Sequence, residues 1–264
     1  MQVYRDLSVL TARPTAADEA RAPHALYGHV DAANAHSVAA WLADAAAALD
    51  AARAAGQRPI VVGGTGLYLA ALTEGLSPMP NVPQAVRDLW RRRQGEETSE
   101  ALHAELARRD PEMAARLRPT DPQRIVRALE VIDGTGRSLL SFQAERSTPL
   151  VDPDNAVRIV LAPNRADLRA RIAHRFEAMM ADGAVAEATA LAARKLDTSL
   201  PAMKAIGVAP LIAHAAGTLD RAAATARAIT ESRQYAKRQD TWFRNRFAHW
   251  PRHRTIEAAA ATLY

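Results

Sequence analysis

The stretch from Ser37 to Glu74 constrains the fold most, because a helix, a buried strand, a tight turn and a second helix follow one another there without interruption. Ser37 is a good N-cap for an amphipathic helix, and Gly56 is placed to end it. Residues 59–62 (Pro-Ile-Val-Val) form the short apolar run typical of a strand that is buried on both faces. Residues 63–65 then make a glycine turn into the next helix. This order of elements predicts an α/β fold.

The rest of the chain divides into a core that continues this pattern and a helical insertion. Between residues 78 and 144 short helices are predicted without any strand, whereas strand character returns at 157–161. The last of these helices is expected from Pro122 to about Ile132, with Asp121 as its N-cap and Gly134 past its end. We therefore assign residues 1–77 and 145–264 to the α/β core, and 78–144 to the insertion. A long helix from about residue 219 to 246 is predicted near the end of the core.

The composition narrows the class of protein and of partner. No apolar run approaches the ~18 residues of a membrane span, so a cytoplasmic protein without membrane contact is expected. The chain has no cysteine, which excludes disulfides, thiolate nucleophiles and cysteine-ligated zinc. The net charge of +5 favours a polyanion or a phosphorylated ligand as partner. Many basic proteins bind neither, so this feature leaves the partner open.

The glycine turn at Gly63, Gly64 and Thr65 places main-chain N–H groups and a hydroxyl at the end of the predicted strand, where α/β sheets usually bind ligands. It can equally be a tight turn that needs the conformational freedom of glycine. It is not a phosphate loop of the Walker type, because the sequence G-x-x-x-x-G-K-[ST] does not occur in the chain.

Two helices carry arginines at helical spacing. Arg124 and Arg127 are predicted to share one face with Val131, whereas Ile125 and Leu129 lie on the apolar face. Guanidinium groups at this spacing can bind successive phosphates of a nucleic acid, although a solvated basic face would have the same pattern.

The second basic helix is the long one near the C-terminal end. Arg233, Lys237 and Arg244 recur at helical spacing, and Trp242 and Phe243 can either anchor the helix or stack on bases. A basic surface helix remains the alternative.

Other kinds of chemistry have little support in the sequence. His249 and His253 have the spacing of a metal-binding pair, but Pro251 breaks the helix between them, so no metal site is expected. No arrangement of Ser, His and Asp with a nucleophile turn is present, which argues against a hydrolase with a catalytic triad.

Five segments together resemble the tRNA dimethylallyltransferases, which are the tRNA delta(2)-isopentenylpyrophosphate transferases of the IPP transferase family. They are MQVYR at residues 1–5, PIVVGGTGLY at 59–68, L-x-x-x-D-P at 106–111, DPQRIVRALE at 121–130 and RQYAKRQDTWFR at 233–244. The resemblance extends over nearly the whole chain, and the segments at 121–130 and 233–244 are the most specific.

The resemblance implies an α/β core like that of P-loop NTPases, with a parallel sheet and an inserted helical subdomain that binds tRNA. It implies transfer of a dimethylallyl group from dimethylallyl diphosphate to N6 of the adenine at position 37 of tRNAs, with this adenine flipped into a channel. The partners would be the anticodon stem-loop and dimethylallyl diphosphate, the metal would be Mg²⁺, and the protein would be a monomer.

Several residues match positions that contact tRNA in the family. These are Met1, Gln2, Thr65, Arg87, Gln123, Arg124, Ile125, Val126 and Arg127. Weaker candidates for contact with tRNA or diphosphate are Lys204, Gly207, Arg233, Lys237, Arg238 and Arg244.

The chain departs from the family pattern in two places. In the family an Asp-Ser pair directly precedes the residues that match Met1 and Gln2; its Asp is the general base, and the phosphate loop and first strand lie further upstream. We therefore expect no catalytic residue in this chain, the first strands of the sheet to be missing, little activity and poor solubility. The second departure lies at residues 204–209, where the family often has a Gly-Tyr pair followed by polar residues. Val208 and Ala209 cannot make the hydrogen bonds of those side chains, so tRNA contact is expected only weakly there.

Three alternatives remain open at the level of sequence. An isopentenyltransferase acting on adenine nucleotides would not need the insertion at 78–144, and a small-molecule P-loop kinase would not need the segment at 233–244. A non-catalytic RNA-binding remnant would bind tRNA in a salt-dependent way without modifying it.

Overall fold

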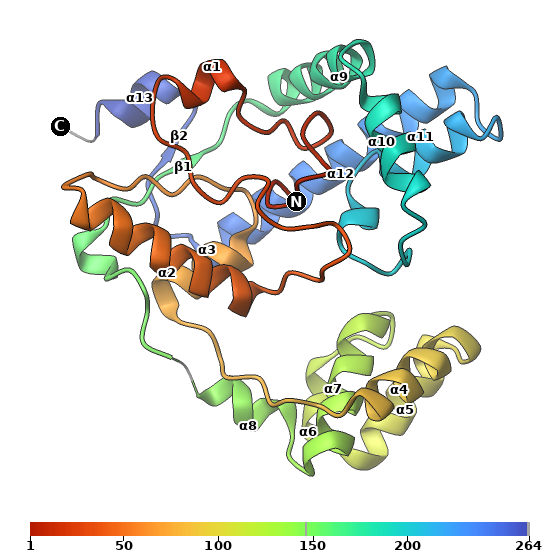
Figure 1. Ribbon diagram of the computed structural model, residues 1–264. Helices are drawn as coiled ribbons and strands as arrows, with labels where there is room; N and C mark the ends of the chain where they lie inside the picture. The colour runs from red at the N-terminus through yellow and green to blue at the C-terminus, as the bar shows by residue number, and fades with distance from the viewer. Residues whose placement is uncertain (146, 263–264) are drawn as a thin grey trace. The chain divides into compact units, whose positions relative to one another are not determined.

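The protein forms two compact units in the computed structural model, which describes residues 1–145 and 147–262. The first unit combines Met1–Ala71 with Val151–Tyr264, and the second is the contiguous segment Leu72–Leu150 (Figure 1). The segment 78–144, predicted from the sequence as an insertion, falls within the second unit. Its role in binding tRNA stays a prediction.

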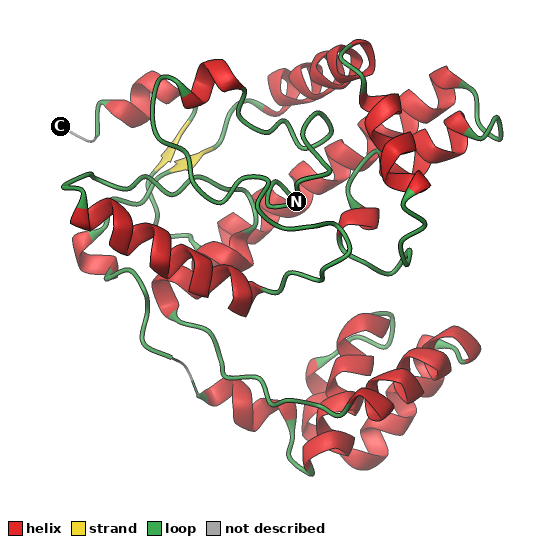
Figure 2. Ribbon diagram, in the orientation of Figure 1, coloured by secondary structure: helices red, strands yellow, loops and turns green. Residues whose placement is uncertain are grey.

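The first unit contains mostly helices and loops around one short parallel sheet (Figure 2). Strand β1 (Val160–Leu161) pairs in parallel with β2 (Arg252–His253), with Val160 opposite Arg252. The helices are α1 (Ala16–Glu19), α2 (Val38–Ala54), α3 (Gly66–Glu74, which continues into the second unit), α9 (Arg165–Ala181), α10 (Ala184–Ala193), α11 (Val208–Ala215), α12 (Arg221–Arg246) and α13 (Ile256–Ala260), with 3₁₀ turns η1 (Pro153–Asn155) and η2 (Ala202–Lys204).

The strand predicted at residues 59–62 does not form in the described chain. These residues are not assigned to any strand, and the side chains of Ile60 and Val62 are 81% and 77% exposed. An apolar run becomes a central strand only when neighbouring strands pair with its main chain and other layers cover its side chains. Neither occurs here among the described residues. The strand predicted at 157–161 is present only as Val160–Leu161.

Local sequence signals set several helix ends, among them the predicted start of α2 after Ser37. The Ser37 hydroxyl accepts a hydrogen bond from the Ala40 N–H at 3.1 Å and so caps α2, which is followed by Gly56 in the left-handed region at φ +65°. The carboxylate of Asp220 accepts from the Ala223 N–H at 2.8 Å at the start of α12. Each cap satisfies a main-chain donor that the first turn of a helix leaves without a partner.

The C-terminal end of α12 is anchored by aromatic packing beside the sheet. Phe243, Phe247 and Trp250 form one buried cluster with Val160 of β1 and Ala70 of α3. The rings of Phe247 and Trp250 stack with their centroids 4.0 Å apart. Burial of three aromatic side chains contributes on the order of several kcal/mol, so α3, β1 and α12 are fixed to one another.

The second unit is a bundle of short helices around α7 (Pro122–Thr135). The others are α4 (Gln84–Glu96), α5 (Ser99–Arg109), α6 (Pro111–Arg116) and α8 (Leu139–Ala144). The expected end of α7 before Gly134 is wrong, because the helix continues to Thr135 and ends at Gly136, which has φ +68°. Gly134 lies inside the helix, where a Cβ atom would be 2.9 Å from Cγ1 of Val82. Close packing of the two segments therefore explains this glycine.

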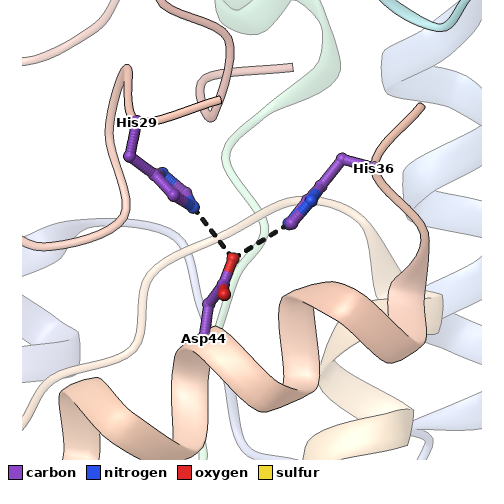
Figure 3. A group of neighbouring side chains, drawn as sticks. All are labelled: His29, His36 and Asp44. Carbon is purple, nitrogen blue, oxygen red and sulfur yellow. Dashed lines mark hydrogen bonds and ion pairs between the residues drawn. The ribbon is translucent and has the colours of Figure 1, made fainter. Parts of the chain in front are cut away.

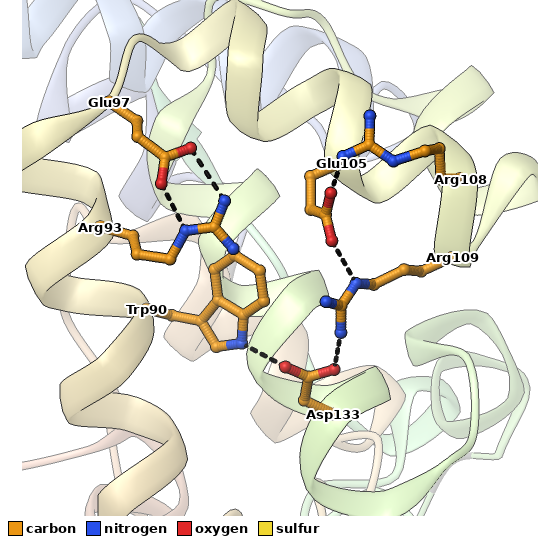
Figure 4. Close-up of polar contacts among 7 residues, drawn as sticks. All are labelled: Trp90, Arg93, Glu97, Glu105, Arg108, Arg109 and Asp133. Atoms are coloured by element: carbon orange, nitrogen blue, oxygen red, sulfur yellow. Dashed lines mark hydrogen bonds and ion pairs between the residues drawn. The ribbon is translucent and has the colours of Figure 1, made fainter.

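Trp90 is the centre of a polar network in the second unit (Figure 4). Its side chain is fully buried, and its indole N–H donates to Asp133 at 2.8 Å. Arg93 and Arg109 lie over the indole ring at 4.6 and 5.4 Å from its centroid. Arg93 also pairs with Glu97, and Arg109 with Asp133. The network satisfies the buried indole and fixes the contact of α4 with α7.

The length and apolar character of the helices decide whether any of them could span a membrane. Across the described part of the chain, none of them has both the length and the apolar character needed to span a bilayer.

Candidate nucleic-acid interface

The glycine turn lies against α12. The main-chain oxygen of Gly64 accepts a hydrogen bond from the Gln239 amide at 2.7 Å, and the hydroxyls of Thr65 and Tyr235 are 3.2 Å apart. Tyr235 and Gln239 are four residues apart, so they project from the same side of α12. Two of the five segments that carry the family resemblance, 59–68 and 233–244, therefore meet in one place.

This close approach depends on the absence of side chains at two glycines. A Cβ atom at Gly66 would lie 2.0 Å from the Trp242 ring, and one at Gly64 would lie 2.1 Å from Nε2 of Gln239. Neither glycine has a positive φ. Space, and not an unusual main-chain conformation, thus favours glycine at these positions, more strictly at Gly66, which faces a ring, than at Gly64, which faces the end of a flexible side chain.

A groove of about 830 Å³ runs between α3 and α12 next to the turn. Leu67 and Ala70 of α3 form one wall. The α12 wall combines positive charge, amides, a hydroxyl and an indole ring, from Gln234, Lys237, Arg238, Thr241, Trp242, Asn245 and Arg246. The α12 residues recur every three to four positions and so form one helix face. Such a groove suits a ligand with both phosphates and an apolar or aromatic part.

Only some of the basic residues predicted on α12 belong to this groove. Lys237 and Arg238 line it and are exposed. Arg244 is instead paired with Asp240 at 3.2 Å, and Arg233 donates to a main-chain oxygen of α9 at 3.5 Å. Neither Arg233 nor Arg244 is a lining residue, so the structure brings two of the four α12 candidates together.

The two aromatic residues of the same segment have different roles. Trp242 lines the groove and also contacts the glycine turn, whereas Phe243 is buried in the cluster beside the sheet. The sequence left both roles open for both residues. The structure favours an anchor role for Phe243 and leaves one edge of Trp242 available to a ligand.

The weaker candidates for contact with tRNA or diphosphate at residues 204–209 differ in how far they are buried. Lys204 is exposed at the end of η2, but Gly207 is buried with φ +89°, and its Cβ would lie 3.0 Å from Leu10. Val208 is fully buried in the core. The position of Gly207 is explained by main-chain conformation and packing, and a side-chain contact of Val208 with tRNA is excluded.

The candidates on α7 lie on two faces of the helix. Arg124 is 74% exposed and Arg127 is 33% exposed, with Arg127 bound to Glu130 at 3.2 Å. Ile125 and Val126 belong to the core of the second unit, at 0% and 5% exposed. Any tRNA contact through side chains in this stretch thus falls to the two arginines and to the adjacent exposed glutamine.

Three further observations concern the second unit. Val131 does not share the face of the arginines as predicted, because it is fully buried. Gln123 is exposed next to Arg124. The Nε atom of Arg87 is buried and has no hydrogen-bond partner among the described residues. A buried guanidinium nitrogen without a partner is costly, which fits a position that a ligand or water completes.

Gln2 is held within the N-terminal loops of the first unit. Its amide donates to the main-chain oxygens of Thr11 at 3.2 Å and Ala12 at 3.1 Å, and its main-chain oxygen accepts from the Gly28 N–H at 2.9 Å. Met1 is about half exposed. Both residues lie in a loop segment of defined conformation, which suits a part of the chain that holds a ligand.

Tyr235 and Gln239, which contact the glycine turn, are not predicted from the sequence. They appear in the sequence only as neighbours of basic residues. With Trp242 they occur at positions i, i+4 and i+7, and this spacing of uncharged hydrogen-bonding and aromatic groups was the available signal. It indicates a helix face that contacts something other than an apolar core.

The groove does not fit the Mg²⁺ that the resemblance implies. No carboxylate is among its lining residues, and Mg²⁺ prefers carboxylate and other oxygen ligands. Among the described residues, the one group of at least three side chains of metal-ligand type that lie close together is His29, His36 and Asp44. His249 and His253 are not part of such a group.

Comparisons with known proteins agree on one family. The family profile described as IPP transferase matches residues 2–246. A tRNA dimethylallyltransferase of Azorhizobium caulinodans is 52% identical over 252 residues, covering 96% of this chain and 81% of the relative. One from Rhodopseudomonas palustris strain BisB18 is 55% identical over 245 residues, covering 93% of this chain and 78% of the relative.

Solved structures show the same fold. The full-length tRNA isopentenylpyrophosphate transferase of Bacillus halodurans has a TM-score of 0.64 and 31% identity, covering 96% of this chain and 78% of that one. The corresponding enzyme of Staphylococcus epidermidis has a TM-score of 0.61 and 26% identity, with 96% and 81% covered. The predicted α/β fold of the P-loop type is thereby confirmed. Because the profile spans most of the chain and the relatives are more than half identical, the chain belongs to the IPP transferase family.

Proposed function

We propose that this chain acts in the transfer of a dimethylallyl group from dimethylallyl diphosphate to N6 of the adenine at position 37 of tRNA. The names of the relatives, all tRNA dimethylallyltransferases, support this reaction. The observation that carries the proposal is the groove between α3 and α12, which combines basic side chains with an indole ring beside the glycine turn.

The composition of the groove matches what such a ligand requires. Lys237 and Arg238 are exposed cations that can bind phosphates, since each contact with a phosphate releases a counterion and strengthens binding. Trp242 offers a ring edge for contact with a base, and Leu67 is a half-exposed apolar group on the facing wall. We propose that Lys237 and Arg238 bind tRNA, and that dimethylallyl diphosphate is the second substrate of the reaction.

The reaction forms a bond between N6 of adenine and the allylic carbon, while the bond from that carbon to diphosphate breaks and N6 loses a proton. We assign the general base to no residue of this chain. Because the groove offers no oxygen ligand set for Mg²⁺, we derive no step through that ion. The part proposed for the described residues is to bind tRNA and to hold the anticodon stem-loop in register for base flipping.

Charge removal in the groove tests the proposal. The variant Lys237→Ala/Arg238→Ala should weaken binding of tRNA and make the slope of log affinity against log salt shallower by roughly 1.5, as expected for two lost phosphate contacts. Arg227→Ala is the matched control, because Arg227 lies on the same helix, is exposed, and pairs with Glu231 away from the groove. Equal binding of tRNA by these two variants would show that the groove does not contact tRNA.

The exposed arginines of α7 form a second test. Replacing Arg124 and Arg127 by alanine should weaken tRNA binding and flatten its salt dependence while leaving binding of dimethylallyl diphosphate intact. Arg116→Ala is the control in the same unit, since Arg116 is exposed and pairs with Glu112 at 2.9 Å. Unchanged tRNA affinity of the α7 variant would refute this role.

Two alternative functions predict different ligands and products. An enzyme for adenine nucleotides would bind AMP without preferring an anticodon stem-loop that carries adenine at position 37. A non-catalytic RNA-binding protein would bind tRNA but give no isopentenyladenosine when the tRNA is digested and its nucleosides are analysed by mass spectrometry. That analysis also tests the expectation of low activity for these 264 residues, which ready product formation would contradict.

A further inference from the structure

His29, His36 and Asp44 form a compact cluster on the first unit, apart from the groove (Figure 3). Asp44 lies on α2, whereas both histidines come from the loop that precedes this helix. Nε2 of His29 is 2.9 Å and Nε2 of His36 is 3.2 Å from the same carboxylate oxygen of Asp44. All three ligand-type atoms lie within 4.8 Å of one another.

The contact between His36 and Asp44 is close but incompletely satisfied. The His36 side chain is only 11% exposed, and its Nε2 atom is buried without a hydrogen bond, because the orientation toward Asp44 does not meet hydrogen-bond geometry. This ring nitrogen has Asp44 as an ionic neighbour but lacks a partner aligned with the nitrogen. A metal ion is such a partner, since it is bound along the lone pair of a neutral imidazole.

We infer that His29, His36 and Asp44 bind one Zn²⁺ ion or a similar first-row divalent cation. Two imidazoles and one carboxylate are a donor set that zinc accepts, with distances of about 2.0–2.2 Å from metal to ligand. In a tetrahedral site such bonds place ligand atoms on the order of 3.3 Å apart. The observed 2.9 and 3.2 Å are close to that spacing, so the ion enters with small side-chain adjustments.

This site differs from the Mg²⁺ site that the family resemblance implies. Mg²⁺ and Ca²⁺ prefer oxygen ligands, whereas imidazole suits Zn²⁺, Cu²⁺, Ni²⁺ and Co²⁺. The chain contains no cysteine, so these histidines do not compete with thiolates for zinc. Three protein ligands leave a fourth position for water, and His29 and Asp44, about a third exposed, let the ion enter from solvent.

The ion would hold the loop that supports the N-terminal segment. Main-chain hydrogen bonds join Gly28 to Gln2 and Val30 to Val3, and they flank His29 on both sides. The main-chain N–H of His36 itself donates to the Tyr4 hydroxyl at 3.3 Å. A metal ligated by His29, His36 and Asp44 thus ties α2 to the segment that carries Gln2. Its role is structural, and the inference does not depend on the proposed transfer reaction.

Metal content of the purified full chain tests the inference. After treatment with a chelator, the protein should take up one equivalent of Zn²⁺, its melting temperature should rise, and Mg²⁺ at equal concentration should have no such effect. Loss of a group that only orients a ligand costs 10–100-fold in metal affinity in other sites, so losing a ligand should cost more than about 100-fold. His36→Gln and Asp44→Asn should each show this loss.

His24→Gln is the matched control, because His24 lies in the same loop region and is exposed but contacts only the main-chain oxygen of Ala22 and the Tyr27 ring. It should keep full zinc affinity. A readout without substitutions is modification of histidines by diethyl pyrocarbonate: zinc should protect His29 and leave His24 reactive. Absence of stoichiometric uptake by the wild-type chain, or protection of both histidines alike, would overturn the inference.

Discussion

The packing of Gly66 against Trp242 gives the sharpest test of the groove. A Cβ atom at position 66 would lie 2.0 Å from Cε3 and 2.2 Å from Cζ3 of the indole, whereas ordinary contact begins at 3.4 Å. In Gly66→Ala the ring therefore has to withdraw by about 1.4 Å. Withdrawal disturbs the packing of Trp242 on Phe243 and Phe247, whose ring centroids lie at 5.9 and 5.0 Å.

The expected magnitude follows from two opposing effects. Overpacking of this kind costs about 1–3 kcal/mol. Alanine is favoured over glycine in a helix by up to about 1 kcal/mol, but Gly66 is the first residue of α3, where this gain is smaller. We expect a net loss of about 1–2 kcal/mol in the stability of the contact between α3 and α12.

Two neighbouring glycines provide graded controls. Gly63→Ala should be neutral or slightly stabilising, because nothing lies within 4 Å of the added Cβ. Gly64→Ala meets only the end of the flexible Gln239 side chain, so it should lose about 1 kcal/mol with the hydrogen bond to the Gly64 oxygen.

Hydrogen exchange followed by mass spectrometry on peptides of α12 measures this series. Amide protection in the C-terminal half of α12 should fall by roughly 5- to 30-fold in Gly66→Ala and remain unchanged in Gly63→Ala. Equal protection in these two variants would show that the turn does not dock on α12, and the groove argument would fail with it.

Three further predictions concern sites outside the groove. Trp90→Ala should destabilise the second unit by about 3–5 kcal/mol, seen as an earlier urea transition, because it leaves a large cavity in the core; a loss below 1 kcal/mol would contradict the packing described. The Ala33 main-chain N–H, and then Arg194, hold the pKa of Asp31 below its usual value. The contribution of ionised Asp31 to the stability of the fold is therefore present above about pH 4 and is lost as the pH falls through the lowered pKa. NMR titration of Arg194→Ala should show a higher Asp31 pKa than in the wild type, and an unchanged value would refute the pairing. Glu187→Ala should cost about 2 kcal/mol in thermal or urea denaturation, because the carboxylate accepts from three consecutive main-chain N–H groups near the N-terminus, and a neutral result would refute that role.

Local signals in the sequence predict the helices well, because their causes are local. Ser37 and Asp121 each cap the helix that the sequence assigns to them, since a side-chain oxygen reaches a main-chain N–H within three residues. Gly134 was misjudged for the opposite reason. Its role depends on contact with Val82, far away in the sequence, and nothing in the local pattern shows that contact.

Burial of strands and sites is not local, and there the sequence predicts less. Ile60 and Val62 have the pattern of a central strand, but burial of that run depends on segments that pair with it. The cation candidates on α12 share one pattern, yet Arg244 is occupied by Asp240, which only the three-dimensional arrangement reveals. His29 and His36 lie in a loop whose path the local sequence does not determine, so the sequence gives no sign that they meet Asp44.

The distance in sequence between the two walls of the groove has a consequence for biosynthesis. Thr65 and its partner Tyr235 are separated by 170 residues. At about 5–20 residues per second, a ribosome completes the second wall roughly 10–30 s after the first has been made. The second unit, being one contiguous stretch of short helices, has time to fold in that interval. During translation the glycine turn therefore lacks its partners on α12 until the last part of the chain has been made. In this interval the nascent protein is most accessible to chaperones and most prone to misassociation.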